Sequence, residues 1–332
     1  MRAAVIGAGS WGSALAIHLG RVGCKVRLWA YEPEVVEAIA RTRRNPLFLT
    51  EAEFPENVEA TGSLEEACRG AEVAVLVVPV QFARSVLARL KGLLGDGVPL
   101  VSASKGIEVS TLERVDEMAD ELLRLGRERF VALSGPSFAH EVAAGLPTAA
   151  VLAGWSEQVV SALQEVFSSV SFRFYGSDDV VGVELAGALK NVVAIAAGMA
   201  TGLELGHNAL AALMTRGLHE IARLGVRLGG REETFRGLAG MGDLVLTCTG
   251  ALSRNRRAGE RLGRGESLDD VLAGREVAEG VPTSRAAARL ARLLGVDMPV
   301  TFAVDAILAG HLRPREAVEA LMTRQLKREA EL

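Results

Sequence analysis

The most apolar stretch of this chain contains a single lysine. The run from Val180 to Gly198, VVGVELAGALKNVVAIAAG, has Glu184, Lys190 and Asn191 as its only charged or amide side chains. A bare ammonium buried in such surroundings is strongly unfavourable, so Lys190 needs water, a partner or a chemical task. Either it is a desolvated lysine that exchanges a proton with a carbonyl or hydroxyl group, or it snorkels to water or pairs with Glu184 or another acid.

A second group suited to chemistry is the glycine-rich turn GAGSWG at residues 7 to 12. It follows an apolar run of strand length, Arg2 to Ile6, and precedes a helical pattern, Ser13 to Leu19, and another strand, Lys25 to Trp29. In this context the first glycine permits a tight turn, the second lets the backbone approach a pyrophosphate, and the third lets helix pack on strand. The N-terminus of the helix also attracts phosphate. We therefore predict a dinucleotide site built on Gly7, Gly9 and Gly12.

The end of the second strand bears on the choice of dinucleotide. An acid at this point usually holds the adenine ribose 2′-hydroxyl and repels a 2′-phosphate. Here Tyr31 lies near that position, Glu32 follows it, and Arg43 and Arg44 come further on. The pattern is compatible with NAD, NADP or both, and the preference between them stays open.

Polar side chains also follow two later strands of the first half. Lys105 stands in the loop Ser102 to Gly106, and the segment SGPSFA occupies residues 134 to 139. Ligands of parallel sheets bind at the carboxyl ends of strands, so both loops are candidates for contacts to an anion or a carbonyl group. The alternative is a solvated lysine and a turn with a helix cap.

The second half contains a candidate anion site and an isolated acid. Ser253 is a natural helix N-cap, and the arginines of SRNRR that follow it oppose the helix dipole. Cations are favourable there if an anion lies among them, so Arg254, Asn255 and backbone N–H groups would suit a phosphate. A solvated basic helix is the alternative. Asp243 lies in GMGDL, between glycines and an apolar run.

The elements that position these residues change character near residue 178. Up to that point strands and helices alternate, which predicts an α/β domain with a Rossmann-type, doubly wound parallel sheet. Beyond it the pattern is helical, so we expect a dinucleotide-binding domain at residues 1–179 and an all-α substrate domain at 180–332. The expected strands are Arg2–Ile6, Lys25–Trp29, Glu72–Val78, Val98–Ala103, Phe130–Leu133, Pro147–Leu152 and Ser171–Tyr175.

Composition narrows the possible partners. The 332 residues carry a net charge of −4, which gives no basic field for nucleic acid. The three cysteines lack metal-site or disulfide spacing, and no secretory signal begins the chain, so we expect a cytoplasmic protein without a metal. Val180 to Gly198 is nearly long enough to span a bilayer, but its central lysine favours a buried core helix over an integral membrane segment. Helical domains of such enzymes often form homodimers, which we expect here.

Taken together, the motifs resemble the bacterial type of NAD(P)-dependent glycerol-3-phosphate dehydrogenase. The resemblance runs through nearly the whole chain, in the order GAGSWG, ASKG, SGPSFAHEVAAGLPTA, LKNVVAIAAGM, GMGDLVLTCTGALSRNRR and VAEGVPTS. It implies reversible hydride transfer between NAD or NADP and the pair glycerol 3-phosphate and dihydroxyacetone phosphate. It also implies that the enzyme supplies glycerol 3-phosphate for glycerophospholipid synthesis.

The resemblance assigns roles to individual residues. Lys190 is similar to the general acid/base, and Asp243 to the acid that orients it or a substrate hydroxyl. Residues that resemble substrate contacts are Lys105, Gly135, Ser137, Ser253, Arg254 and Asn255. Residues that resemble cofactor contacts are Ser10, Trp11, Tyr31, Lys105, Ala139, Arg254, Val277 and Glu279, beside the three glycines. The family often carries His or Arg in place of Tyr31, which weakens any inference about NADP.

Two other functions remain alternatives at this level. A 3-hydroxy-acid dehydrogenase can pair a similar fold with a lysine and an asparagine on a helix, but its carboxylate substrate does not need SRNRR. A dinucleotide-responsive binding protein without turnover would not need a lysine in an apolar helix. The five histidines show no convincing acidic partner in the sequence, unlike the His–Asp pair of 2-hydroxy-acid dehydrogenases.

Overall fold

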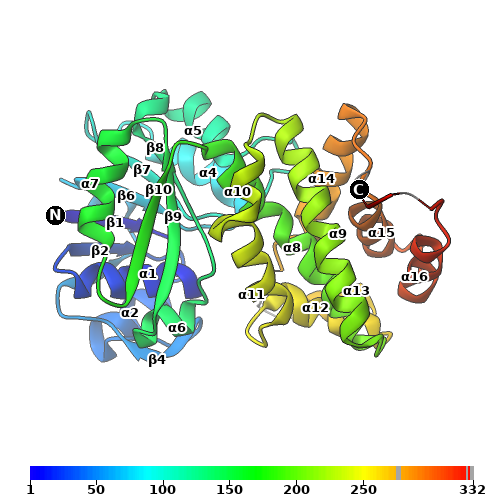
Figure 1. Ribbon diagram of the computed structural model, residues 1–332. Helices are drawn as coiled ribbons and strands as arrows, with labels where there is room; N and C mark the ends of the chain where they lie inside the picture. Colours follow the sequence, from blue (N-terminus) through cyan, green and yellow to red (C-terminus); the bar gives the residue numbers. More distant parts are fainter. Residues whose placement is uncertain (274–277, 327, 330–332) are drawn as a thin grey trace. The chain divides into compact units, whose positions relative to one another are not determined.

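The computed structural model describes residues 1–273, 278–326 and 328–329, which form two compact units (Figure 1). The first unit comprises Met1–Ser104 and Arg114–Val180, and the second comprises Lys105–Glu113 and Val181–Leu332. Residues 105 to 113 therefore group with the second unit, although they follow a strand of the first. The first unit contains a large sheet with helices, and the second is helical.

The sheet of the first unit has eight strands in the order β10-β9-β8-β7-β6-β1-β2-β5. Its central strands are almost entirely buried, as expected for a parallel sheet covered on both faces. This confirms the predicted Rossmann-type class, and β1 and β2 have the predicted bounds. The strands are β1 (Arg2–Ile6), β2 (Lys25–Trp29), β5 (Val58–Thr61), β6 (Val73–Leu76), β7 (Leu100–Ser102), β8 (Phe130–Ser134), β9 (Thr148–Gly154) and β10 (Phe172–Ser177).

One neighbouring pair in this sheet departs from the parallel arrangement. Strand β9 runs antiparallel to β8, with Val131 opposite Gly154, whereas β10 is parallel to β9. The connection between β8 and β9 contains the helix α6 (Ala139–Ala144) of six residues. Such a helix is about 9 Å long, while a five-residue strand spans about 16 Å. The helix therefore covers only part of the length of a strand, and β9 begins at the edge of the sheet where β8 ends.

Helices and one small strand pair complete the first unit. Pro33 occupies the first turn of α2, where its fixed φ suits a helix start. The sequence patterns did not predict α2, β3, β4 or β5, whereas the helix expected after SGPSFA is α6. The helices are α1 (Ser10–Arg21), α2 (Pro33–Thr42), α3 (Leu64–Cys68), α4 (Val80–Leu90), α5 (Val115–Leu123), the 3-10 turn η1 (Arg127–Arg129) and α7 (Glu157–Phe167), and the pair is β3 (Arg44–Asn45) with β4 (Leu49–Glu53).

The second unit is built around α8 (Val180–Gly202). This helix is long and apolar enough to cross a membrane, but 83% of its most apolar window is buried inside the protein. It is therefore accounted for as a core helix. The other elements are α9 (Gly206–Arg227), α10 (Glu232–Arg236), the π-helical turn η2 (Leu238–Gly242), α11 (Asp243–Thr249), α12 (Arg254–Gly263), α13 (Leu268–Leu272), α14 (Gly280–Leu294), α15 (Pro299–Leu308) and α16 (Pro314–Met322).

Helices α8 and α12 approach so closely that glycine is required on both. A Cβ added at Gly198 would lie 2.0 Å from the carbonyl oxygen of Arg256, and one added at Gly259 would lie 2.0 Å from that of Ile195. Both distances are far inside van der Waals contact, so larger residues would push the helices apart. This contact fixes the start of α12 relative to α8, the helix that carries Lys190 and is called the lysine helix below.

Candidate active site

The glycine-rich turn has the geometry of a phosphate-binding loop. Gly7 has a φ of +118°, which favours glycine, and a Cβ there would lie 2.6 Å from the Val77 carbonyl oxygen. A Cβ at Gly12 would lie 1.8 Å from the Gly7 carbonyl oxygen, whereas Gly9 has nothing within 4 Å of its Cβ position. The turn is thus packed at its two ends and open in the middle. The open peptide at Gly9, at the start of α1, suits a pyrophosphate.

The other predicted cofactor residues of the first unit lie around this turn or on neighbouring strand ends. The buried Nε1 of Trp11 has no hydrogen-bond partner within the described residues, so one donor remains for a ligand. Ala139 begins α6, which packs against α1, and both Ala139 and Trp11 pack against the core of this unit. Tyr31, just after β2, is 76% exposed and packs edge-on against Trp29.

The SGPSF loop is a tight turn after β8. Gly135 has a φ of +148°, and a Cβ there would lie 2.8 Å from Cα of Ala150. The hydroxyl of Ser137 donates to the carbonyl oxygen of Gly135 at 2.9 Å. Both residues therefore shape the backbone of the loop, whatever further contact they make.

Lys190 lies in a buried charge cluster of the second unit. Its Nζ donates to the carboxylate of Asp243 and, at 2.9 Å, to Oγ1 of Thr247. Lys105 donates from Nζ to the other oxygen of the same carboxylate at 2.7 Å. Lys190 is 6% exposed and Asp243 is 1% exposed. One acid thus joins the two lysines, and it, rather than Glu184, is the acid that pairs with Lys190.

Burial sets the protonation of this cluster. Desolvation lowers the pKa of Lys190 to about 8. The negative charge of Asp243 raises this pKa and so compensates in part, while the positive charge of Lys105 lowers it further. Burial by itself would raise the pKa of Asp243, but the ammonium groups of Lys105 and Lys190 outweigh it and the pKa is lowered. At neutral pH Asp243 is therefore ionised, and Lys190 lies near the balance that a proton donor and acceptor requires.

Thr247 is a member of this cluster that the sequence patterns did not identify. Its hydroxyl donates to the backbone carbonyl of Asp243 at 2.6 Å, which leaves its oxygen free to accept from Lys190. The signal in the sequence is its position four residues after Asp243, which places both on one face of α11. The π-helical turn η2 directly precedes Asp243, a kind of irregularity frequent at functional sites.

The predicted anion site occupies the start of α12. Ser253 is the N-cap, and its Oγ accepts from the N–H of Arg256 at 3.2 Å, which confirms the predicted cap. Arg254 is exposed in the first turn. Asn255 is buried: its Nδ2 donates to Oδ1 of Asn191 at 2.9 Å, and its Oδ1 accepts from the N–H of Gly280 at 2.9 Å. Asn255 thus joins the lysine helix, α12 and α14.

Of the late cofactor residues predicted from VAEG, Glu279 is the N-cap of α14. Burial raises the pKa of Glu279 to about 7, against the favourable charges of Arg254, Lys105 and Lys190. The charges of all three basic side chains therefore act on the Glu279 carboxyl group. Val277 lies outside the described residues.

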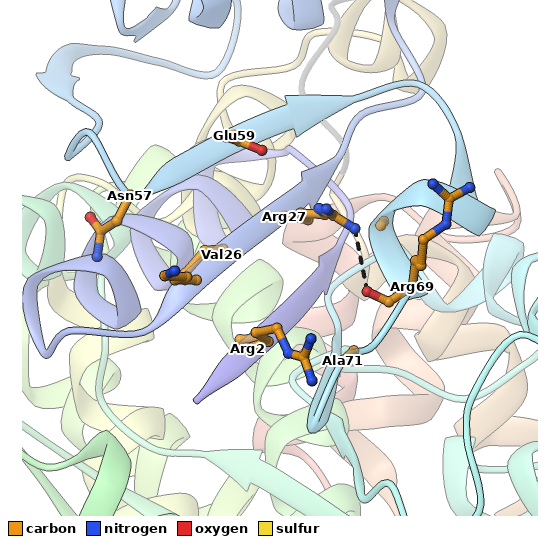
Figure 2. A pocket seen from close by; sticks show the side chains of 10 residues that line it. Arg2, Val26, Arg27, Asn57, Glu59, Arg69 and Ala71 are labelled. Carbon is orange, nitrogen blue, oxygen red and sulfur yellow. Dashed lines mark hydrogen bonds between the residues drawn. The ribbon is translucent and has the colours of Figure 1, made fainter.

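A cavity of about 300 Å³ lies at the opposite edge of the sheet from the glycine-rich turn (Figure 2). It is lined by the amino ends of β1 and β2, including Arg2 and Arg27. Arg27 donates to the carbonyl oxygens of Glu66 and Arg69, at 2.8 and 3.3 Å, and so closes the end of α3. The arginine thus has a structural task at this edge.

The sheet, the open glycine turn and the buried lysine cluster define the class of NAD(P)-dependent dehydrogenases with a helical second domain. Family models agree over both halves. The N-terminal model of NAD-dependent glycerol-3-phosphate dehydrogenase matches residues 2–160, and the C-terminal model matches residues 179–319.

Individual relatives give the same result. A protein of Geobacter sulfurreducens named glycerol-3-phosphate dehydrogenase [NAD(P)+] is 54% identical over 99% of this chain and 98% of its own length. A protein of Nitratidesulfovibrio vulgaris with the same name is 51% identical over 99% of this chain and all of its own. The crystal structure of glycerol-3-phosphate dehydrogenase from Coxiella burnetii, 41% identical, superposes with a TM-score of 0.93 over 97% of this chain and 99% of that one. The chain therefore belongs to the NAD-dependent glycerol-3-phosphate dehydrogenase family.

Proposed function

We propose that this chain interconverts sn-glycerol 3-phosphate and dihydroxyacetone phosphate with NAD or NADP, and that Lys190 is the general acid/base. The observation that carries the proposal is the buried Lys190, held by Asp243 and Thr247 and poised with a pKa of about 8. Such a group can give a proton near neutral pH and take it back in the reverse direction. Membership of the family supports the reaction and the cofactor class.

The proton chemistry follows from the cluster. When bound at the glycine-rich turn, NAD(P)H would supply the hydride for the carbonyl carbon and NAD(P)+ would take it in the reverse reaction. Lys190 Nζ gives a proton to the carbonyl oxygen, which becomes the alcohol, and recovers one from water. Asp243 holds the ammonium in place, while Lys105 offsets the negative charge of Asp243. The Asp243 carboxylate therefore orients Lys190 and does not itself gain the proton.

The substrate phosphate is proposed to bind at the start of α12. Arg254 lies exposed there, among N–H groups at a helix N-terminus. Ser253 and Asn255 already make internal hydrogen bonds, so Ser253 contributes a rigid cap and Asn255 has one N–H left for a ligand. Gly135 and Ser137 are proposed as further substrate contacts.

The cofactor is NAD or NADP, and kcat/KM measured with NADH and with NADPH gives the preference of the enzyme. Gly7, Gly9, Ser10, Trp11 and Gly12 would hold the pyrophosphate end. Further proposed cofactor contacts are Tyr31, Lys105, Ala139, Arg254, Val277 and Glu279. We also propose the division into a cofactor domain, 1–179, and a substrate domain, 180–332.

In the cell, we propose a cytoplasmic homodimer that supplies glycerol 3-phosphate for glycerophospholipid synthesis. The proposal rests on the reaction itself, since glycerol 3-phosphate is the backbone of those lipids. Sedimentation of the purified chain tests the dimer, and a sedimenting monomer at micromolar concentration would remove it.

The decisive test is turnover by the purified protein. Dihydroxyacetone phosphate should support oxidation of NADH or NADPH, followed at the nicotinamide absorbance, while unphosphorylated 3-keto acids should not. Absence of turnover with both cofactors would overturn the proposal. The variant Lys190→Ala should bind NADH normally and lose kcat by orders of magnitude. A Lys190→Ala enzyme with ordinary kcat would remove the catalytic assignment but leave the reaction standing.

A further inference from the structure

Asn45, in β3, is a fully buried asparagine whose amide is saturated with hydrogen bonds. Its Nδ2 donates to the carbonyl oxygen of Ala8 at 2.8 Å and to Oγ of Ser13 at 2.9 Å. Its Oδ1 accepts from the N–H groups of Leu47 at 3.1 Å and Phe48 at 3.2 Å. An asparagine side chain has two donors and two acceptor positions, so all four are used. No motif in the sequence marked this residue.

These bonds fix one peptide of the glycine-rich turn. The Ala8 carbonyl also accepts from Ser13 Oγ at 3.2 Å, so two donors hold it on the protein side. The Ala8–Gly9 peptide is trans, like the others described. In a trans peptide the C=O and N–H bonds point in opposite directions. The Gly9 N–H is therefore turned away from Asn45. A Cβ built at Gly9 would meet no atom within 4 Å, so a ligand can approach the backbone closely at this residue.

The segment at residues 45 to 48 also contacts the glycine-rich turn at a second point. The hydroxyl of Ser10 donates to the carbonyl oxygen of Phe48 at 2.7 Å. Leu47, Phe48 and Trp11 are half-buried and pack against the same core. Residues 45 to 48 therefore hold both the peptide before the open position and the residue after it.

We propose that Asn45 is the positioning residue of the dinucleotide site: it aims the Gly9 N–H at the cofactor pyrophosphate by holding the Ala8 carbonyl. This inference rests on the proposed binding of NAD or NADP. The role needs an amide, because a carboxylate cannot donate to Ala8. An apolar side chain would leave the Ala8 carbonyl with Ser13 as its one donor and would take the acceptor from the N–H groups of Leu47 and Phe48.

The test compares binding and kinetics in three variants. Asn45→Ala removes all four bonds, and Ser13→Ala removes one of the two donors to Ala8. Asn57→Ala is the matched control, because Asn57 Nδ2 likewise donates to two backbone carbonyls, Gly20 at 2.9 Å and Cys24 at 2.8 Å, at the other end of α1. The side chain of Asn57 is labelled in Figure 2. The dissociation constant of NADH is measured by calorimetry, folding by thermal melting, and kcat and KM with dihydroxyacetone phosphate at saturating NADH.

Asn45→Ala should raise the dissociation constant of NADH about 10- to 100-fold, as expected for a lost hydrogen bond to a charged group. Ser13→Ala should raise it about 2- to 10-fold, the range for a neutral one. Values of kcat and KM for the ketone at saturating NADH should stay within about twofold of wild type. Asn57→Ala should lower the melting temperature without weakening NADH binding.

The inference is overturned if Asn45→Ala folds and binds NADH like wild type, or if Asn57→Ala weakens binding equally. Should Asn45→Ala fail to fold, Ser13→Ala decides, and an unchanged dissociation constant there overturns the inference. Wild-type protein that binds neither NADH nor NADPH would instead refute the proposed function.

Discussion

Replacing Asp243 by Asn removes the charge between the two lysines while keeping the side-chain shape. In the native protein this carboxylate accepts from Lys105 at 2.7 Å and from Lys190, and its charge raises the Lys190 pKa against the effect of burial. Opposite charges about 4 Å apart attract by about 4 kcal/mol at an effective dielectric constant of 20. Since about 1.4 kcal/mol corresponds to one pKa unit, the loss amounts to up to about three units. Relaxation of the protein around Lys190 reduces this effect, so we expect the Lys190 pKa to fall by about two units in Asp243→Asn.

The assay is the pH dependence of dihydroxyacetone phosphate reduction, measured as kcat with saturating NADH. Reduction needs protonated Lys190, so the wild-type rate is kept at low pH and lost as pH rises through about 8. In Asp243→Asn the loss should occur about two pH units lower, so kcat at neutral pH falls about tenfold. The reverse reaction needs neutral Lys190, so its wild-type rate should rise through the same pH.

A matched control is Asp305→Asn. Asp305 pairs with Arg292 at 3.2 Å in the same unit, so this variant makes the same chemical change outside the cluster. Its pH profile should superimpose on wild type. If the profile of Asp243→Asn loses activity at the same pH as wild type, Asp243 does not set the protonation of Lys190 and the reasoning is refuted.

Four other substitutions follow from single contacts. Thr247→Val removes the 2.9 Å acceptor of Lys190 and should lower kcat about tenfold with little change in KM, and unchanged kcat would exclude Thr247 from the proton path. Arg254→Ala should raise the KM for dihydroxyacetone phosphate more than it lowers kcat, and an unchanged KM would move the phosphate elsewhere. Gly198→Ala should destabilise the protein by about 3 kcal/mol in urea unfolding, because its Cβ would meet the Arg256 carbonyl at 2.0 Å, and native stability would contradict that contact. Burial lowers the pKa of His18 from 6.5, so the contribution of this neutral side chain to the free energy of unfolding is present above pH 6.5 and lost as the pH falls. In His18→Leu the free energy of unfolding should therefore depend less on pH on the acid side.

Local sequence patterns were sufficient to predict the elements that depend on residues close together in the chain. Strands β1 and β2 follow from short apolar runs, and the glycine turn between β1 and α1 follows from its spacing. Lys190 was identifiable because a charge in an apolar helix is costly wherever the helix lies. Weakly patterned elements such as β4, with one buried residue in five, gave no such signal.

The residues that hold the lysines and the glycine turn could be identified only from the folded chain. Asp243 is 53 positions from Lys190 and 138 from Lys105, and Asn45 is 37 positions from Ala8. The antiparallel direction of β9 likewise leaves no mark in the apolar pattern of the strand. Periodicity and motif spacing describe contacts within a helix turn or a strand, and long-range pairing leaves no such period. The amino-acid sequence thus specified the lysine and the glycines, while packing of α8 against α11 and α12, and of β3 beneath the turn, specified the groups that hold them.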